Sequence, residues 1–255
     1  MFASLADGSI RIGFQRNTPP FSYSPTAGFR PIGYSVDLAE LVLAHIHGGA
    51  DRVPPVEAVE VTSTTREGLL AAGRIDLECG STTITDERRR HFAFSRPIFR
   101  TSHRIAVKGD PGPGFLRVVG IRGSTSQAAL ESEPDPGFGY AFTGVPSIGA
   151  ARDAFLSDDG IDAMVADEVI LRSLLAGAAR PDVRLLDLRL GGEDYGFLLR
   201  KDDGELRRAV DGALSGVLGS PGYRTLIDTW FAGELPGLGF SLEMDPRDRS
   251  FVSES

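Results

Sequence analysis

Hydroxyl-rich loops and arginines supply side chains that could bind an anion. Three Ser/Thr-rich runs, 62–65, 80–83 and 123–126, each follow a predicted strand. Hydroxyl groups and free backbone N–H groups at the start of a helix are good donors to an anion. Arg66 and Arg88 stand just beyond the first two runs, and a guanidinium matches a carboxylate in shape and charge. Each run alone is also what an ordinary helix N-cap looks like, and each arginine could lie on a solvated helix face.

Two adjacent carboxylates, Asp167 and Glu168, follow the apolar run 161–166. A carboxylate at the end of a strand could hold an ammonium group, although alone it is equally an N-cap. Combined with arginines, it would provide both charges that a zwitterion requires. In an open α/β sheet the carboxyl ends of the strands face the ligand crevice, so we expect these groups to face a shared polar site.

Catalytic and metal-binding patterns are weak. The sequence contains no Gly-x-Ser-x-Gly elbow and no phosphate-binding Gly-x-x-x-x-Gly-Lys loop. The single cysteine, Cys79, excludes an internal disulfide and is predicted to be a packed core thiol. Metal-ligand spacing is not apparent among the four histidines, which are His45, His47, His91 and His103. We therefore predict a protein that is not an enzyme and holds no metal and no cofactor.

The composition of the chain limits the classes of molecule that the protein is expected to bind. The 255 residues carry a formal net charge of −8, which disfavours nucleic acid because phosphate binding requires a basic surface. No apolar run is long enough to span a bilayer. Residues 1–9 lack the features of a signal peptide, which leaves two possibilities open: a cytoplasmic protein, or an export signal that has been removed.

Strands and helices alternate along the chain, which predicts a mostly parallel α/β protein. The first set comprises strands at 10–14, 56–61 and 75–78 and helices at 35–44, with Ser35 as N-cap, and 65–72. The pattern then restarts. The second set comprises strands at 104–108, 118–121, 161–166, 183–188 and 195–200, a helix that opens at 123–126, and helices at 204–218 and 223–231. Pattern alone does not distinguish two domains in series from one domain inserted into another.

The segment 76–88, followed by 92–99, resembles the signature of family 3 solute-binding proteins, which serve polar amino acid ABC transporters. The resemblance extends over nearly the whole chain. It includes 19–23 with 33–38, 195–203 and 229–231. The residues Glu-Cys-Gly-Ser-Thr-Thr at 78–83 are most similar to the glutamate/aspartate-binding subgroup.

This resemblance implies a type II periplasmic binding protein-like fold, with two α/β lobes joined by two crossover strands near 104–108 and 194–201. Lobe 1 would be 1–106 plus 197–255, and lobe 2 would be 107–196. The implied protein is a monomer in the periplasm or another extracytoplasmic space. It would bind glutamate, aspartate or a related polar amino acid by closing the two lobes around it, and it would deliver this ligand to the membrane permease of an ABC transporter.

The resemblance also implies a role for individual residues. Arg88 would clamp the ligand α-carboxylate, and Asp167 would take the α-ammonium group. The other residues implied at the site are Ser81, Thr83 and Thr125 beside the carboxylate, Ser63 and Arg66 beside the ligand side chain, and Phe21 as a lining residue.

Two positions depart from the glutamate/aspartate subgroup. Gln15 stands where that subgroup has an arginine, and Arg16, one position on, could substitute for it. Gly149 stands where the subgroup has a histidine. The groups for an amino acid backbone are complete, whereas the pocket for an acidic side chain lacks two donors.

Two alternatives stay open. One is an enzyme of the cyclohexadienyl dehydratase kind on the same scaffold, with Glu168 as the acid. The other is a ligand-sensing domain.

Overall fold

The computed structural model describes residues 8–110, 114–133, 135–176, 178 and 180–242. Most of the N-terminal segment that was considered as a signal peptide, and the tail after 242, lie outside the described residues. The chain forms two compact units: Met1–Arg100 with Asp194–Ser255 make unit 1, and Thr101–Glu193 make unit 2. These boundaries lie a few residues before those that the sequence predicts.

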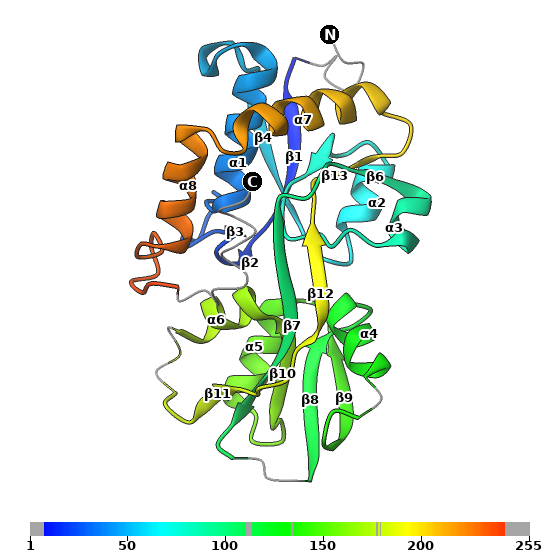
Figure 1. Cartoon of the computed structure of the whole chain (residues 1–255), viewed down its shortest axis with the longest axis vertical. Coiled ribbons are helices and arrows are strands. Elements are labelled where there is room, and N and C mark those ends of the chain that lie inside the picture. The colour runs from blue at the N-terminus through cyan, green and yellow to red at the C-terminus, as the bar shows by residue number, and fades with distance from the viewer. Residues whose placement is uncertain (1–7, 111–113, 134, 177, 179, 243–255) are drawn as a thin grey trace. The chain divides into compact units, whose positions relative to one another are not determined.

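Unit 1 is built on a five-stranded sheet in the order β4-β1-β5-β13-β6 (Figure 1). Strands β1, β4 and β5 run parallel to one another, and β13 is antiparallel to its neighbours β5 and β6. A separate two-stranded sheet joins β2 to β3. The strands of unit 1 are β1 (Ile10–Gln15), β2 (Asn17–Thr18), β3 (Ser22–Tyr23), β4 (Val56–Val61), β5 (Leu77–Glu78), β6 (Phe92–Phe94) and β13 (Leu198–Arg200).

The helices of unit 1 are α1 (Tyr34–His47), the 3-10 turn η2 (Ala50–Arg52), α2 (Arg66–Ala71), α3 (Asp86–His91), α7 (Gly204–Val217) and α8 (Pro221–Phe231). Helix α1 packs against α7 and α8 through apolar residues at helical spacing. Side-chain caps start three of these helices, because the hydroxyl or carboxylate accepts a backbone N–H of the first turn; the capping residues are Thr85, Asp203 and Ser220.

The start of α1 differs from the prediction. Gly33, not Ser35, is the N-cap residue, and it has a φ of 144°. A Cβ at Gly33 would lie 2.2 Å from the carbonyl oxygen of Phe21, so only glycine fits this close approach. Ser35 lies inside the helix, where its hydroxyl donates a 3.0 Å hydrogen bond to the carbonyl of Gly80. Ser35 therefore ties α1 to one of the hydroxyl-rich loops.

Unit 2 contains a six-stranded sheet in the order β11-β7-β10-β8-β9, in which β12 also pairs with β7. Its strands are β7 (Phe99–Lys108), β8 (Phe115–Ile121), β9 (Gly139–Val145), β10 (Ala163–Asp167), β11 (Val183–Leu185) and β12 (Leu190–Tyr195). The first two residues of β7 and the last two of β12 belong to unit 1. Strands β8, β9 and β10 are parallel, and β7 is antiparallel to β10 and β11. The helices are α4 (Thr125–Ser132), α5 (Ile148–Ser157) and α6 (Glu168–Ala176). Buried aliphatic residues of β7, β8, β10 and α4 form its core.

Candidate functional site

Three parallel strands of unit 1 bring their polar ends together. Because β1 lies between β4 and β5, the loops that follow these strands meet at one edge of the sheet. The Gln15 amide, at the end of β1, donates to Ser63 Oγ at 3.4 Å and accepts from Ser81 Oγ at 3.4 Å. The structure thus groups three of the predicted residues, and Gln15 lies between the other two.

Arg66 and Glu78 are buried near this group. Arg66 is 4% exposed and Glu78 is fully buried. Thr82 Oγ1 donates to Glu78 Oε2 at 2.6 Å. Burial raises the pKa of the Glu78 carboxyl, and the charge of Arg66 partly opposes that rise. Arg66, which was predicted to lie beside the ligand side chain, is therefore influenced by the buried carboxyl group of Glu78. Glu78 was not predicted at the site.

Helix α3 positions Arg88. Thr85 caps the helix by accepting the Arg88 backbone N–H at 3.1 Å. The guanidinium donates from Nη1 to the Thr83 carbonyl at 3.0 Å, and its Nε lies 3.2 Å from Glu67 Oε1. The Arg88 side chain is 16% exposed. Arg88 is therefore oriented by its own loop and retains partial access to solvent.

Two further predicted residues of unit 1 have other surroundings. Phe21 is fully buried, and its ring makes edge contacts with Phe99 and Tyr195 at centroid distances of 4.9 and 5.1 Å. Arg16 forms a bidentate pair with Glu60, at 2.9 and 2.6 Å. The structure therefore places Phe21 in the aromatic core, and it directs Gln15, not Arg16, toward the serine hydroxyls.

In unit 2, Asp167 is part of a buried polar cluster. Strands β8 and β10 are parallel neighbours, so the start of α4 meets the end of β10. Asp167 Oδ1 accepts from Ser126 Oγ at 3.1 Å and lies 2.7 Å from His103 Nδ1. His103 Nε2 lies 2.7 Å from Glu193 Oε1, and the predicted residue Thr125 also hydrogen-bonds to Glu193.

His103 is an imidazolium ion between two carboxylates. Burial lowers its pKa, but the hydrogen bonds and charges of Asp167 and Glu193 outweigh burial and raise the pKa to about 10. Burial and the nearby Asp167 raise the pKa of Glu193 against the opposing effect of His103. Neither His103 nor Glu193 was predicted at the site, because β7 and β12 bring them to Asp167 only in the folded sheet.

The same three side chains are of types that bind metals. Ligand atoms of His103, Asp167 and Glu193 lie within 4.8 Å of one another. A metal requires a ring nitrogen without a proton, whereas both ring nitrogens here face carboxylate oxygens at 2.7 Å. The raised pKa, about 10, means that a metal would have to displace a proton from the ring at neutral pH. The residues do not suit a metal.

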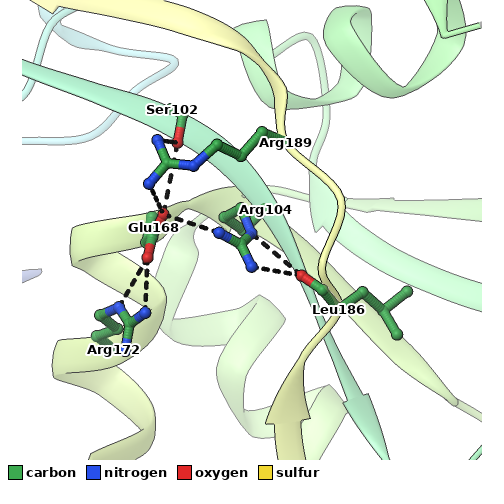
Figure 2. Close-up of polar contacts among 6 residues, drawn as sticks. All are labelled: Ser102, Arg104, Glu168, Arg172, Leu186 and Arg189. Carbon is green, nitrogen blue, oxygen red and sulfur yellow. Dashed lines mark hydrogen bonds and ion pairs between the residues drawn. The ribbon is translucent and has the colours of Figure 1, made fainter. Parts of the chain in front are cut away.

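Glu168 has a different environment from its neighbour Asp167. Figure 2 shows its carboxylate surrounded by three guanidinium groups, at 3.2 Å from Arg104, 2.7 Å from Arg172 and 3.0 Å from Arg189. Its side chain is 1% exposed. Arg104 also donates to the Leu186 carbonyl. Because three cations hold this carboxylate, it lacks the features of an acid catalyst.

Known proteins resemble this chain over most of its length. Residues 10–233 match the model of bacterial extracellular solute-binding proteins, family 3. The L-glutamate/L-aspartate-binding protein of Pseudomonas aeruginosa is 31% identical over 249 residues, which cover 92% of this chain and 80% of that protein. The glutamine-binding protein of Geobacillus stearothermophilus is 30% identical over 206 residues, which cover 74% of this chain and 72% of that protein.

A solved structure supports the same relationship. It is an ancestral amino acid-binding protein, a precursor of cyclohexadienyl dehydratase, and it matches with a TM-score of 0.72 and 26% identity over 89% of this chain and 96% of its own. Across the described residues, no helix has both the length and the apolar character required to cross a bilayer. The predicted fold class is confirmed as the type II, two-lobed α/β fold. The chain belongs to the family 3 bacterial extracellular solute-binding proteins.

Proposed function

We propose that this protein binds a polar α-amino acid outside the cytoplasm and delivers it to the permease of an ABC importer. Arg88 takes the α-carboxylate, with Ser81, Thr83 and Thr125 as further donors, and Asp167 takes the α-ammonium group. The observation that carries the proposal is that each of the two charged groups is held by neighbours of its own unit: Arg88 by Thr83 and Glu67, and Asp167 by Ser126 and His103.

The hydrogen bonds and ion pairs that orient Arg88 and Asp167 favour a role in binding. A buried ligand charge must be met by an opposite charge with hydrogen bonds, and preorganised partners reduce the entropy lost on binding. Arg88 belongs to unit 1 and Asp167 to unit 2, and each has polar partners within its own unit. The relatives named above are binding proteins, and the arginines around Glu168 argue against an acid catalyst at that position.

Calorimetry with the common amino acids tests this proposal. Arg88→Ala and Asp167→Asn should each weaken binding by at least about thirtyfold, since truncating one partner of a buried charge pair costs roughly 2 kcal/mol or more. Arg90→Ala, on the exposed side of the same helix, and Asp153→Asn, 74% exposed on α5, are the matched controls and should change affinity less than twofold. Normal binding by either Arg88→Ala or Asp167→Asn would refute the proposal, as would the absence of binding for every amino acid.

A further inference from the structure

The part of the unit 1 site that would meet the ligand side chain contains neutral groups as well as Arg66. Gln15, Ser63 and Ser81 are uncharged, and each can both donate and accept a hydrogen bond. Gln15 is 6% exposed, and its two hydrogen bonds, at 3.4 Å, are longer than the usual 2.7–3.2 Å for such pairs. Its amide can therefore exchange these weak partners for a ligand.

Each arginine near this part of the site already has a carboxylate close by in unit 1. Arg16 is paired with Glu60 and Arg88 with Glu67. The charge of Arg66 acts on the buried carboxyl of Glu78. Two of these three arginines are thus already paired with carboxylates of the protein, which reduces the positive charge left for a second carboxylate on the ligand. Burying a carboxylate without its own counter-charge is costly.

Two acceptor oxygens lie close to Gly80. A Cβ at Gly80 would lie 2.4 Å from Glu78 Oε1 and 3.8 Å from Gln15 Oε1. Glu78 Oε1 is buried and accepts no hydrogen bond from any described residue. Only a residue without a side chain fits at position 80, which leaves the Gln15 amide uncovered by that loop.

We propose, building on the function proposed above, that the ligand side chain is an uncharged primary carboxamide, as in glutamine or asparagine. A carboxamide presents one donor group and one acceptor, so Gln15 pairs with it amide to amide while the hydroxyl of Ser63 rotates to donate or accept. The pairing of Arg16 and Arg88 with carboxylates of the protein favours these amides over glutamate and aspartate. This assignment differs from the preference that the sequence resemblance implies.

The test compares four ligands on the purified protein by calorimetry at pH 7: L-glutamine, L-asparagine, L-glutamate and L-aspartate. At least one amide should bind at least tenfold more tightly than its matching acid. Equal or tighter binding of the acids would overturn the carboxamide assignment while leaving the amino acid-binding function intact. Failure of all amino acids to bind would overturn both.

A charge variant separates a role in specificity from a structural role. Gln15→Arg adds a cation without a counter-charge, so the ratio of amide affinity to acid affinity should fall at least tenfold. Asn17→Arg adds the same charge at an exposed position two residues along, and it should leave the ratio unchanged. A Gln15→Arg variant that weakens all four ligands alike would show that Gln15 only supports the fold, and it would overturn the assignment.

Discussion

Replacing His103 by glutamine should destabilise unit 2 in a pH-dependent way. The ring has 4% exposure and lies between Asp167 and Glu193, at 2.7 Å from each. Removing it leaves two buried carboxylates facing each other. Moving the pKa from 6.5 to about 10 corresponds to at most about 5 kcal/mol, at roughly 1.4 kcal/mol per pH unit. Breaking a buried ion pair typically costs about 3–5 kcal/mol, so we expect a loss of that order at pH 7.

The sign of the pH dependence follows from the raised pKa. The contribution of His103 is fully present below its unfolded-state pKa of about 6.5, and it is lost as pH rises through the folded-state pKa of about 10. The stability difference between wild type and His103→Gln should therefore shrink by up to about 1.4 kcal/mol per pH unit between pH 7 and 10.

Urea unfolding followed by far-UV circular dichroism, at pH 7, 8, 9 and 10, measures this difference. Trp230, the one tryptophan of the sequence, lies in unit 1 and supplies a separate fluorescence signal for that unit. His91→Gln, at an exposed position on α3, is the matched control and should follow wild type at every pH. Parallel curves for wild type and His103→Gln across this range would refute the idea that His103 is held as an imidazolium ion.

Three further outcomes are expected. Glu168→Gln should lower the free energy of unfolding by about 3–5 kcal/mol in urea, since three guanidinium groups lose their shared counter-charge; an unchanged midpoint would refute this. Tyr34→Phe should cost about 1–3 kcal/mol, because the hydroxyl, fully buried, donates to the Ile98 carbonyl at 2.6 Å and contacts the Tyr223 hydroxyl at 3.2 Å; a thermal scan that shows no loss would contradict it. Burial raises the pKa of the Cys79 thiol, so a thiol reagent should label the native protein at least about a hundredfold more slowly than the unfolded protein, and equal rates would contradict the buried assignment.

Local patterns predicted much of the fold. The hydroxyl-rich run 123–126 was expected to open a helix, and Ser124 caps α4 by accepting the Gln127 backbone N–H. Cys79 was predicted to be a core thiol, which its full burial confirms. The apolar run before Asp167 is the buried strand β10. These features depend on neighbours within a few residues, which are visible in the sequence.

The features that sequence reasoning missed depend on distant partners. Ser35 has good N-cap chemistry, but the approach of Gly33 to the Phe21 carbonyl decides where α1 begins. His103 meets Asp167 and Glu193 across three strands, and no local spacing reveals that contact. One signal was available: His103 is a polar residue within the long buried strand β7, where an ionisable group needs a partner.

The position of β13 in the sheet has a consequence for synthesis. The outer strand β6 has β13 as its neighbour, and β13 is formed by residues 198–200, which follow the whole of unit 2 in the chain. As the chain emerges from the ribosome, the whole of unit 2 is made as one continuous stretch before β13, the strand that pairs with β6, has been synthesised. Unit 1 closes its sheet only after the chain has returned, through contacts of high sequence separation that form slowly. Unit 2 can therefore assemble first, and the sheet of unit 1 is completed last. Until residue 200 has been made, β5 and β6 both lack β13, and their unpaired backbone groups are open to pairing with other chains.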